Sequence, residues 1–165
     1  MSFQRTIKSA SATPMQYDED GNPLCRWCKS IVKPPKKTFC SKECIHQWKL
    51  RTSTSYLRKC VVRRDKGICA ICKVNCLAIT RGFKRPKRGE TWPAWKARVT
   101  ALRKKYGIPK HRTTFYDVDH ILPVAEGGGA MIDDLMANCR TLCLPCHRKV
   151  TSAFATKRAK KKSSK

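Results

Sequence analysis

The stretch TLCLPCHRK, residues 141–149, brings Cys143, Cys146 and His147 almost side by side. A Cys-x-x-Cys-His sequence is typical of c-type haem attachment. A Cys-x-x-Cys pair is also typical of one half of a zinc site, in which two such pairs hold one ion. The two interpretations make different demands on the rest of the chain, because only the zinc site needs a second pair.

A second pair is present upstream, where Cys69 and Cys72 lie in GICAICK. Haem attachment would leave this pair without a role, so we predict that the two pairs bind one structural Zn²⁺ through four thiolates. Cys76 lies close enough in sequence to act as a substitute ligand. His147 could replace Cys146 on the zinc, but the Cys146 thiol would then be stranded. We therefore expect His147 to serve a different site.

A separate group of cysteines lies nearer the N-terminus, in LCRWC and FCSKEC. Its spacing suits a second tetrahedral Zn²⁺ site, with the ligands Cys25, Cys28, Cys40 and Cys44. In a chain without an export signal, such pairs favour metal binding over disulfides. The remaining thiols are expected to be small buried apolar groups: Cys60, Cys76 and Cys139.

The charge of the chain favours a polyanionic partner. Lys and Arg number 37 and Asp and Glu number 11, so the formal net charge is +26 on 165 residues. Solubility alone needs only about 2–8 charges on a small domain. No apolar run approaches the length of a membrane-spanning helix, and the sequence does not open with a signal-peptide core. We expect an intracellular protein that binds nucleic acid, located in the nucleus of a eukaryote or in the cytoplasm or nucleoid otherwise.

Composition and periodicity divide the chain into four parts. We predict a flexible leader over 1–23, a four-cysteine zinc module with a helix over 24–53, a larger domain over 54–151 and a basic tail over 152–165. The tail is interpreted as a disordered solvated run or, in a eukaryote, as a nuclear targeting signal. The larger domain contains a basic helical insertion, residues 77–113.

The insertion carries an apolar stripe along a helix expected from about Thr91 to Tyr106. The stripe recurs with helical spacing at Trp92, Trp95, Val99, Leu102 and Tyr106. Such a stripe is more often core than a platform on which nucleic-acid bases stack. The basic residues beside it could still contact DNA.

Acidic residues gather just after the insertion. Five of the 11 acids lie between residues 117 and 134, namely Asp117, Asp119, Glu126, Asp133 and Asp134. Carboxylates repel phosphate unless a divalent cation lies between them, so we predict that at least one of these side chains binds such a cation. Asp119 is the best candidate, because His120 is adjacent and His147 follows downstream.

Three segments together resemble the HNH nuclease family with its ββα-metal fold: VDHILPVAEGGG at 118–129, Asn138, and LCLPCHRKVT at 142–151. The likeness covers about residues 55–151. With the N-terminal cysteine module, the chain further resembles the HNH domains at the end of annealing helicases that also carry a Ran-binding-type zinc finger. The resemblance implies a small zinc-stabilised α+β fold.

The resemblance also implies roles for individual residues. His120 would be the general base, and Asp119 and His147 would hold one catalytic divalent ion, Mg²⁺ or Mn²⁺. Asn138 would orient His120 or fasten the loop between the strands. Simpler structural roles compete with these: His120 could cap the end of a strand, and Asn138 could serve a turn.

The predicted function is a metal-dependent HNH endonuclease that cuts DNA with low sequence specificity and with some selectivity for DNA structure. The alternative is a non-catalytic two-zinc module that binds nucleic acid. We expect a monomer, or a dimer if both strands are cut. Binding should depend steeply on salt, because basic side chains would contact phosphates. The expected contacts are Arg58, Arg63, Lys96, Arg103, Lys104, Arg140, Arg148 and Lys149.

Overall fold

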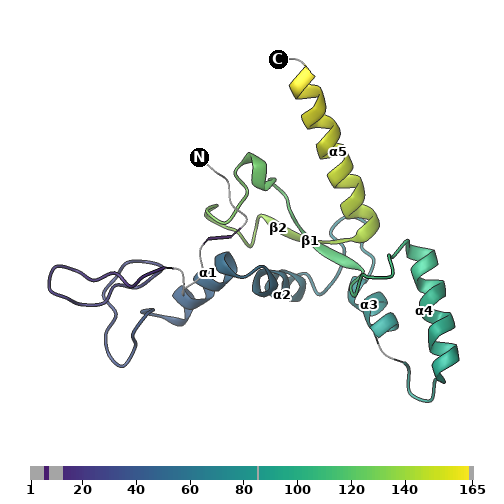
Figure 1. The fold of residues 1–165 in the computed structure, drawn as a ribbon, viewed down its shortest axis with the longest axis horizontal. Coiled ribbons are helices and arrows are strands. Elements are labelled where there is room, and N and C mark those ends of the chain that lie inside the picture. The colour runs from purple at the N-terminus through teal and green to yellow at the C-terminus, as the bar shows by residue number, and fades with distance from the viewer. Residues whose placement is uncertain (1–5, 8–12, 85, 164–165) are drawn as a thin grey trace. The chain divides into compact units, whose positions relative to one another are not determined.

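The computed structural model describes residues 6–7, 13–84 and 86–163 (Figure 1). It divides into two compact units. The first comprises residues 1–60 and 120–138, and the second comprises residues 61–119 and 139–165. Part of the predicted leader, residues 1–5 and 8–12, lies outside the described residues, as do the last two residues of the predicted tail. None of the described helices is long and apolar enough to cross a membrane.

The first unit contains the N-terminal cysteine module and helix α1, Lys42–Thr52. The Ser41 hydroxyl caps this helix by accepting a hydrogen bond from the Cys44 amide at 3.1 Å, as expected for a serine at an N-cap. Cys25, Val32 and Cys44 form a small buried cluster. A core of this size cannot support a fold alone, so a bound metal is expected to contribute to its stability.

Residues 13–23 differ from the predicted flexible leader, because they fold back on the cysteine module. The Asp18 side chain accepts a hydrogen bond from the Asn22 amide at 2.7 Å and closes a turn. The Arg26 guanidinium donates to the Thr13 carbonyl, and the Leu24 amide donates to the Gln16 carbonyl. Asp and Asn favour such turns through their own side chains. The polar composition of residues 13–23 therefore reflects a hydrogen-bonded turn and not a flexible segment.

Arg51 joins α1 to the loop that precedes the second strand in sequence. Its side chain is buried, and its guanidinium donates to the carbonyls of Ile132 at 3.2 Å and Asp133 at 3.0 Å. The same group lies 4.4 Å from the centre of the Trp27 ring. Because a buried cation needs several partners, these contacts hold the loop in place within the first unit.

Two strands form the only sheet among the described residues: β1, Tyr116–His120, and β2, Cys139–Cys143. The Ile121 amide donates to the Asn138 carbonyl, and the Leu144 amide donates to the Phe115 carbonyl. Both bonds fit one antiparallel register, in which Asp119 lies opposite Arg140. The 3₁₀ turn η2, Val124–Glu126, lies between the strands in sequence.

Five helices are described in all. Helix α2 comprises Thr54–Arg64, and the predicted helix of the insertion is α4, Trp92–Tyr106, capped by Thr91 and by Gly107 at a φ of 60°. The second strand runs directly into α5, Leu144–Ser163, as Figure 1 shows. The described part of the predicted disordered tail is therefore helical, which its many Ala, Lys and Arg residues favour.

The insertion also contains a helix that the sequence analysis missed, α3, Cys76–Lys84. Its buried residues, Cys76, Thr80 and Phe83, recur with helical spacing and face the core of the second unit. The Thr80 hydroxyl accepts a hydrogen bond from the Phe115 amide at 3.0 Å. Helix α3 packs against α4, so the insertion forms part of the core.

Asp65 ties the end of α2 to β2 and gives a prediction about stability. One carboxylate oxygen accepts from Arg64 and the other from the Thr141 amide, both at 2.8 Å. Burial alone would raise the pKa of Asp65, but these hydrogen bonds hold it below its usual value. We expect Asp65→Asn to lower the free energy of unfolding at neutral pH by about 1–3 kcal/mol.

The pH dependence of this difference provides the check. Because the pKa is lower in the folded state, the carboxylate stabilises the fold above its unfolded pKa, and this contribution is lost as the pH falls. Urea unfolding of both proteins should therefore show a gap that narrows toward acid. A gap that is constant with pH would contradict the role assigned to the charge. Asp20→Asn, at an exposed turn, is the matched control.

Candidate active site and metal centres

Two groups of four thiols have the geometry of metal sites. In the second unit, the sulfurs of Cys69, Cys72, Cys143 and Cys146 all lie within 4.8 Å of one another. The sulfurs of Cys72 and Cys143 are 3.6 Å apart. Four thiolates at about 2.3 Å from a tetrahedral Zn²⁺ would lie about 3.8 Å apart. The donor set therefore fits zinc, as its spacing predicts.

The N-terminal group is built in the same way from Cys25, Cys28, Cys40 and Cys44. The sulfur of Cys40 lies 3.4 Å from the sulfurs of both Cys28 and Cys44. Hydrogen bonds from the Ser30 hydroxyl and amide lower the pKa of the Cys28 thiol to about 6. Thiolates are the form that binds metal, so this environment favours ligation.

Cys76 does not join the thiolate group of the second unit. Its thiol is fully buried and lies 3.6 Å from the Val74 carbonyl. Burial, together with the neighbouring thiolates, raises the pKa of Cys76 to about 12, so the thiol stays protonated. The pKa of Cys69, by contrast, is lowered to about 6: burial opposes this shift, but backbone amides stabilise the thiolate. Cys76 is therefore not expected to act as a substitute zinc ligand.

His147 lies outside the sulfur group and faces two carboxylates. It is in the first turn of α5, next to Cys146. Its Nε2 atom is 3.9 Å from Asp119 Oδ1, and its Nδ1 atom is 3.8 Å from Asp117 Oδ2. Asp117 and Asp119 are two residues apart on β1, so their side chains leave the same face of the strand. The imidazole therefore lies between the two acids.

The Asp119 and His147 atoms fit a shared divalent cation. Oxygen and nitrogen ligands lie about 2.0–2.2 Å from such an ion, so two of them are separated by at most about 4.0–4.4 Å. The observed 3.9 Å between Asp119 Oδ1 and His147 Nε2 falls within this limit. The Asp119 side chain is 13% exposed and the His147 side chain is 32% exposed, so the imidazole is accessible to solvent.

Each carboxylate is held by an arginine. The Arg140 guanidinium donates twice to Asp119 Oδ2, at 3.0 and 3.1 Å, and leaves Oδ1 on the side of His147. Arg112 donates to both oxygens of Asp117 at 2.7 Å. The sequence singles out Asp119 among the acids, and no role is predicted for Asp117 or Arg112. The spacing of two residues between the acids on a predicted strand was the signal that could have added Asp117.

Several residues predicted to contact nucleic acid have partners within the protein. Arg140 pairs with Asp119, and Arg148 donates to the Gly107 carbonyl at 2.9 Å. Arg103 donates to the carbonyls of Pro109 and Arg112. Arg58 is half-buried. The predicted contacts that are exposed to solvent are Arg63, Lys96, Lys104, Arg148 and Lys149.

Asn138 fastens the loop between the strands from within the first unit. Its Oδ1 atom accepts from the Leu122 amide at 2.8 Å, and its Nδ2 atom donates to the carbonyls of Leu122 and Gly128 at 3.1 and 2.9 Å. The side chain is 8% exposed. A Cβ atom at Gly128 would collide with the Leu122 carbonyl, so only glycine allows this close approach. His120, half-buried, is the last residue of β1 and leads into the loop.

We expect Asn138→Ala to loosen this loop. The substitution removes three hydrogen bonds from partly buried backbone groups, each costing about 1–3 kcal/mol where water cannot replace it. The protein should be less stable to urea, and amide hydrogens of residues 121–129 should exchange faster. Asn138→Asp keeps the acceptor but places a carboxylate against the carbonyls of Leu122 and Gly128, so its effect should be at least as large. Unchanged exchange in Asn138→Ala would show that the loop is held by other contacts.

Comparisons with known proteins give consistent matches. Residues 107–153 match the HNH endonuclease family. The chain is 30% identical over 156 residues to the human protein named DNA annealing helicase and endonuclease ZRANB3, and 32% identical over 157 residues to its mouse counterpart. Each alignment covers 86% of this chain and 14% of the relative, so the chain spans about one seventh of the length of these proteins.

A solved structure, that of the human ZRANB3 HNH domain, also matches. It is 28% identical to this chain, with a TM-score of 0.43, and the alignment covers 67% of this chain and 96% of the solved one.

Proposed function

This chain belongs to the HNH endonuclease family through residues 107–153, and on that premise we propose that it hydrolyses DNA phosphodiester bonds with the help of a divalent cation. The observation that carries the proposal is the approach of Asp119 and His147 to 3.9 Å beside a separate group of four thiols. A purely structural zinc module needs the thiols but has no use for a carboxylate and an imidazole facing one another.

The site residues have distinct parts in the proposed reaction. Asp119 Oδ1 and His147 Nε2 would hold a divalent cation, which would polarise the phosphate and stabilise charge on the leaving oxygen. Arg140 holds the other oxygen of Asp119 and so orients Oδ1 toward His147. His120, the next residue along β1, would take the proton from the attacking water, since a neutral imidazole accepts protons near physiological pH.

Asp117 is proposed to set the proton position on His147. Its carboxylate lies on the Nδ1 side of the ring, at 3.8 Å, and is itself held by Arg112. A carboxylate on that side favours the tautomer with the proton on Nδ1, which leaves the Nε2 lone pair for the cation. Asp117 is therefore a positioning residue.

DNA is the proposed substrate because of the charge. A net charge of +26 attracts any polyanion, and the exposed cations Arg63, Lys104 and Lys149 are placed to contact phosphates. Phosphate contacts carry no sequence information. Low sequence specificity and a steep loss of affinity with added salt are expected to follow.

Incubation of supercoiled plasmid with the zinc-loaded protein tests the function. Nicked or linear plasmid should appear when Mg²⁺ or Mn²⁺ is added and should be absent without added cation. Asp119→Asn should weaken cleavage strongly, because an amide binds a divalent cation more weakly than a carboxylate, whereas Asp20→Asn should not. Binding of plasmid without cleavage under every cation would instead support a non-catalytic module.

A further inference from the structure

The N-terminal half of α4 presents the Trp92 ring to solvent, although its periodicity predicts a core helix. None of the residues of α4 is fully buried. Val99 and Tyr106, farther along the stripe, pack against the core of the second unit. Trp92, at its start, is 57% exposed. The apolar stripe therefore has a half that packs and a half that remains available for a ligand.

In the exposed half, Trp92 and Trp95 form an aromatic surface that we call the ledge. The rings of Trp92 and Trp95 have centres 4.4 Å apart and are inclined by 31°. The Lys96 ammonium lies 5.5 Å from the centre of the Trp92 ring. A single exposed tryptophan needs no explanation, but a pair of indoles with a cation against one of them is an arrangement that flat, negatively charged ligands can use.

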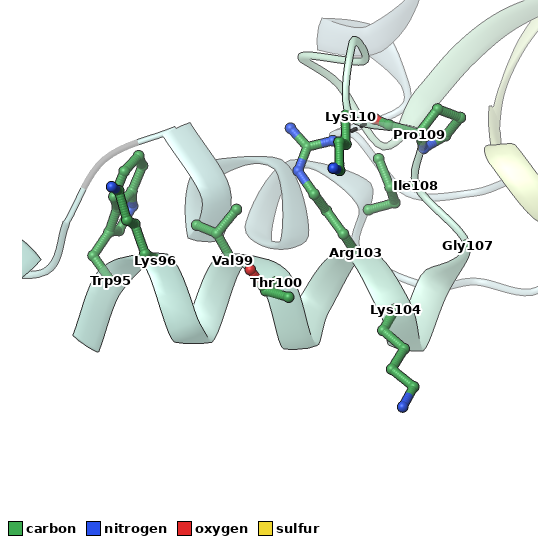
Figure 2. Close-up of a pocket in the computed structure, with 10 residues that line it drawn as sticks. All are labelled: Trp95, Lys96, Val99, Thr100, Arg103, Lys104, Gly107, Ile108, Pro109 and Lys110. Carbon is green, nitrogen blue, oxygen red and sulfur yellow. Dashed lines mark hydrogen bonds between the residues drawn. The ribbon is translucent and has the colours of Figure 1, made fainter. Parts of the chain in front are cut away.

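A hollow of about 660 Å³ adjoins the ledge. Figure 2 shows Trp95, Val99 and Arg103 leaving the same side of α4, with Arg103 reaching the segment that contains Ile108 and Pro109. The volume lies within the range of about 300–1,000 Å³ that is common for ligand sites. The hollow therefore offers an apolar surface of useful size next to the two indoles.

The charge around the hollow decides what kind of ligand fits. None of the ten described residues that line the hollow is acidic, and two of them, Lys96 and Lys110, are exposed lysines. Glu90, the acid nearest to this helix in sequence, is paired with Arg98 at 2.7 Å. The hollow therefore combines apolar walls with a positive rim, which suits a ligand that has flat rings and negative charges.

We propose that the ledge and the hollow bind unpaired bases of a DNA strand, with Lys96 and Lys110 contacting the phosphates on either side. In a duplex the faces of the bases are covered by their neighbours, so only an unpaired base can stack on an indole. The proposal rests on the proposed function for the choice of DNA and extends it: the enzyme would favour DNA that contains a single-stranded segment.

The test compares the affinity for single-stranded and duplex DNA. Fluorescence anisotropy without added divalent cation would follow binding of labelled oligothymidylate of about 12 nucleotides and of a duplex of equal length. Trp92→Ala should raise the Kd for oligothymidylate about 5- to 100-fold, as expected for the loss of a stacked base, and leave duplex binding nearly unchanged. Trp92→Phe, which keeps a ring, should restore most of the affinity.

Control variants separate stacking from charge and from misfolding. Ile71→Ala removes another exposed apolar side chain, 49% exposed and outside the hollow, and should change neither Kd. Lys96→Ala and Lys110→Ala should each weaken oligothymidylate binding and reduce its salt dependence by about 0.7 per lost phosphate contact. Zinc content and thermal unfolding should match the wild type in all of these variants.

Three results would overturn the proposal: Trp92→Ala with no effect on oligothymidylate, Trp92→Ala with equal effects on both probes, or a polyglutamate peptide that binds in a Trp92-dependent manner when oligothymidylate does not. The last would make the ligand a protein. Plasmid cleavage by the same variants distinguishes the two proposals. If the protein cleaves plasmid but its preference for single-stranded over duplex DNA does not depend on Trp92, only the stacking site is disproved. If that preference depends on Trp92 but no cleavage occurs, only the nuclease activity is disproved.

Discussion

Replacing His120 by alanine is expected to slow plasmid cleavage by about 10²- to 10⁴-fold, the usual contribution of a general base. The loss should appear in the rate at saturating protein, because the imidazole acts on the attacking water and not on DNA binding. His120 belongs to neither thiol group and is not one of the pair of Asp119 and His147, so removal of its ring should leave these groups in place.

The controls for this experiment use another histidine and a binding assay. His111→Ala changes an exposed imidazole in the loop after α4 and should cleave like the wild type. A gel shift without added divalent cation should give the same affinity for the wild type and for His120→Ala. Full cleavage by His120→Ala would remove the general base from the proposal, and loss of the gel shift would assign His120 to folding or binding instead.

Replacing Cys143 by serine is expected to unfold the second unit. A structural Zn²⁺ contributes about 10–16 kcal/mol in apparent folding free energy, which is as large as the whole stability of a typical domain, about 5–15 kcal/mol. Cys143 ends β2, and its group also anchors the start of α5 through Cys146. Loss of the metal would therefore release the helix turn that carries His147. Circular dichroism, thermal unfolding and the zinc content per chain would measure the effect.

Matched substitutions show whether the effect comes from the metal. Cys60→Ser changes a half-buried thiol outside both groups and should bind as much zinc as the wild type. Cys44→Ser should remove one zinc and disturb residues 13–52 while the other site keeps its ion. A chelator should reproduce both losses together. A Cys143→Ser protein that keeps its cooperative unfolding and its full zinc content would contradict the assignment of this group.

The cysteines of the two candidate zinc groups could be predicted from sequence because they occur in short segments. A Cys-x-x-Cys pair places two thiols around one turn whatever surrounds it, so Cys69 with Cys72 and Cys143 with Cys146 are recognisable as pairs. The structure confirms that they assemble into a group that can hold zinc. The helix over 92–106 was predicted for a similar reason, since its apolar spacing is local.

Interactions between distant segments were not predictable in this way. Arg140 pairs with Asp119 because the strand register sets them opposite one another, and Arg112 reaches Asp117 because the turn after α4 brings it back to β1. Because the sequence does not show this pairing, Arg140 was predicted to contact DNA. Helix α3 was overlooked because it is only 9 residues long and contains Gly82, and only the core shows that its three buried residues share a face.

Spacing along the chain was sufficient to indicate two groups of four thiols that could hold zinc, a strongly basic charge and an HNH motif, because each depends on residues close in sequence or on the summed charge. The tertiary structure was needed to place His147 between two carboxylates, to pair these with arginines and to leave Trp92 exposed. Those features arise when β1, β2 and α5 pack together and when α4 meets the core along only half of its stripe. Contacts of this kind depend on register and packing, which no single segment encodes.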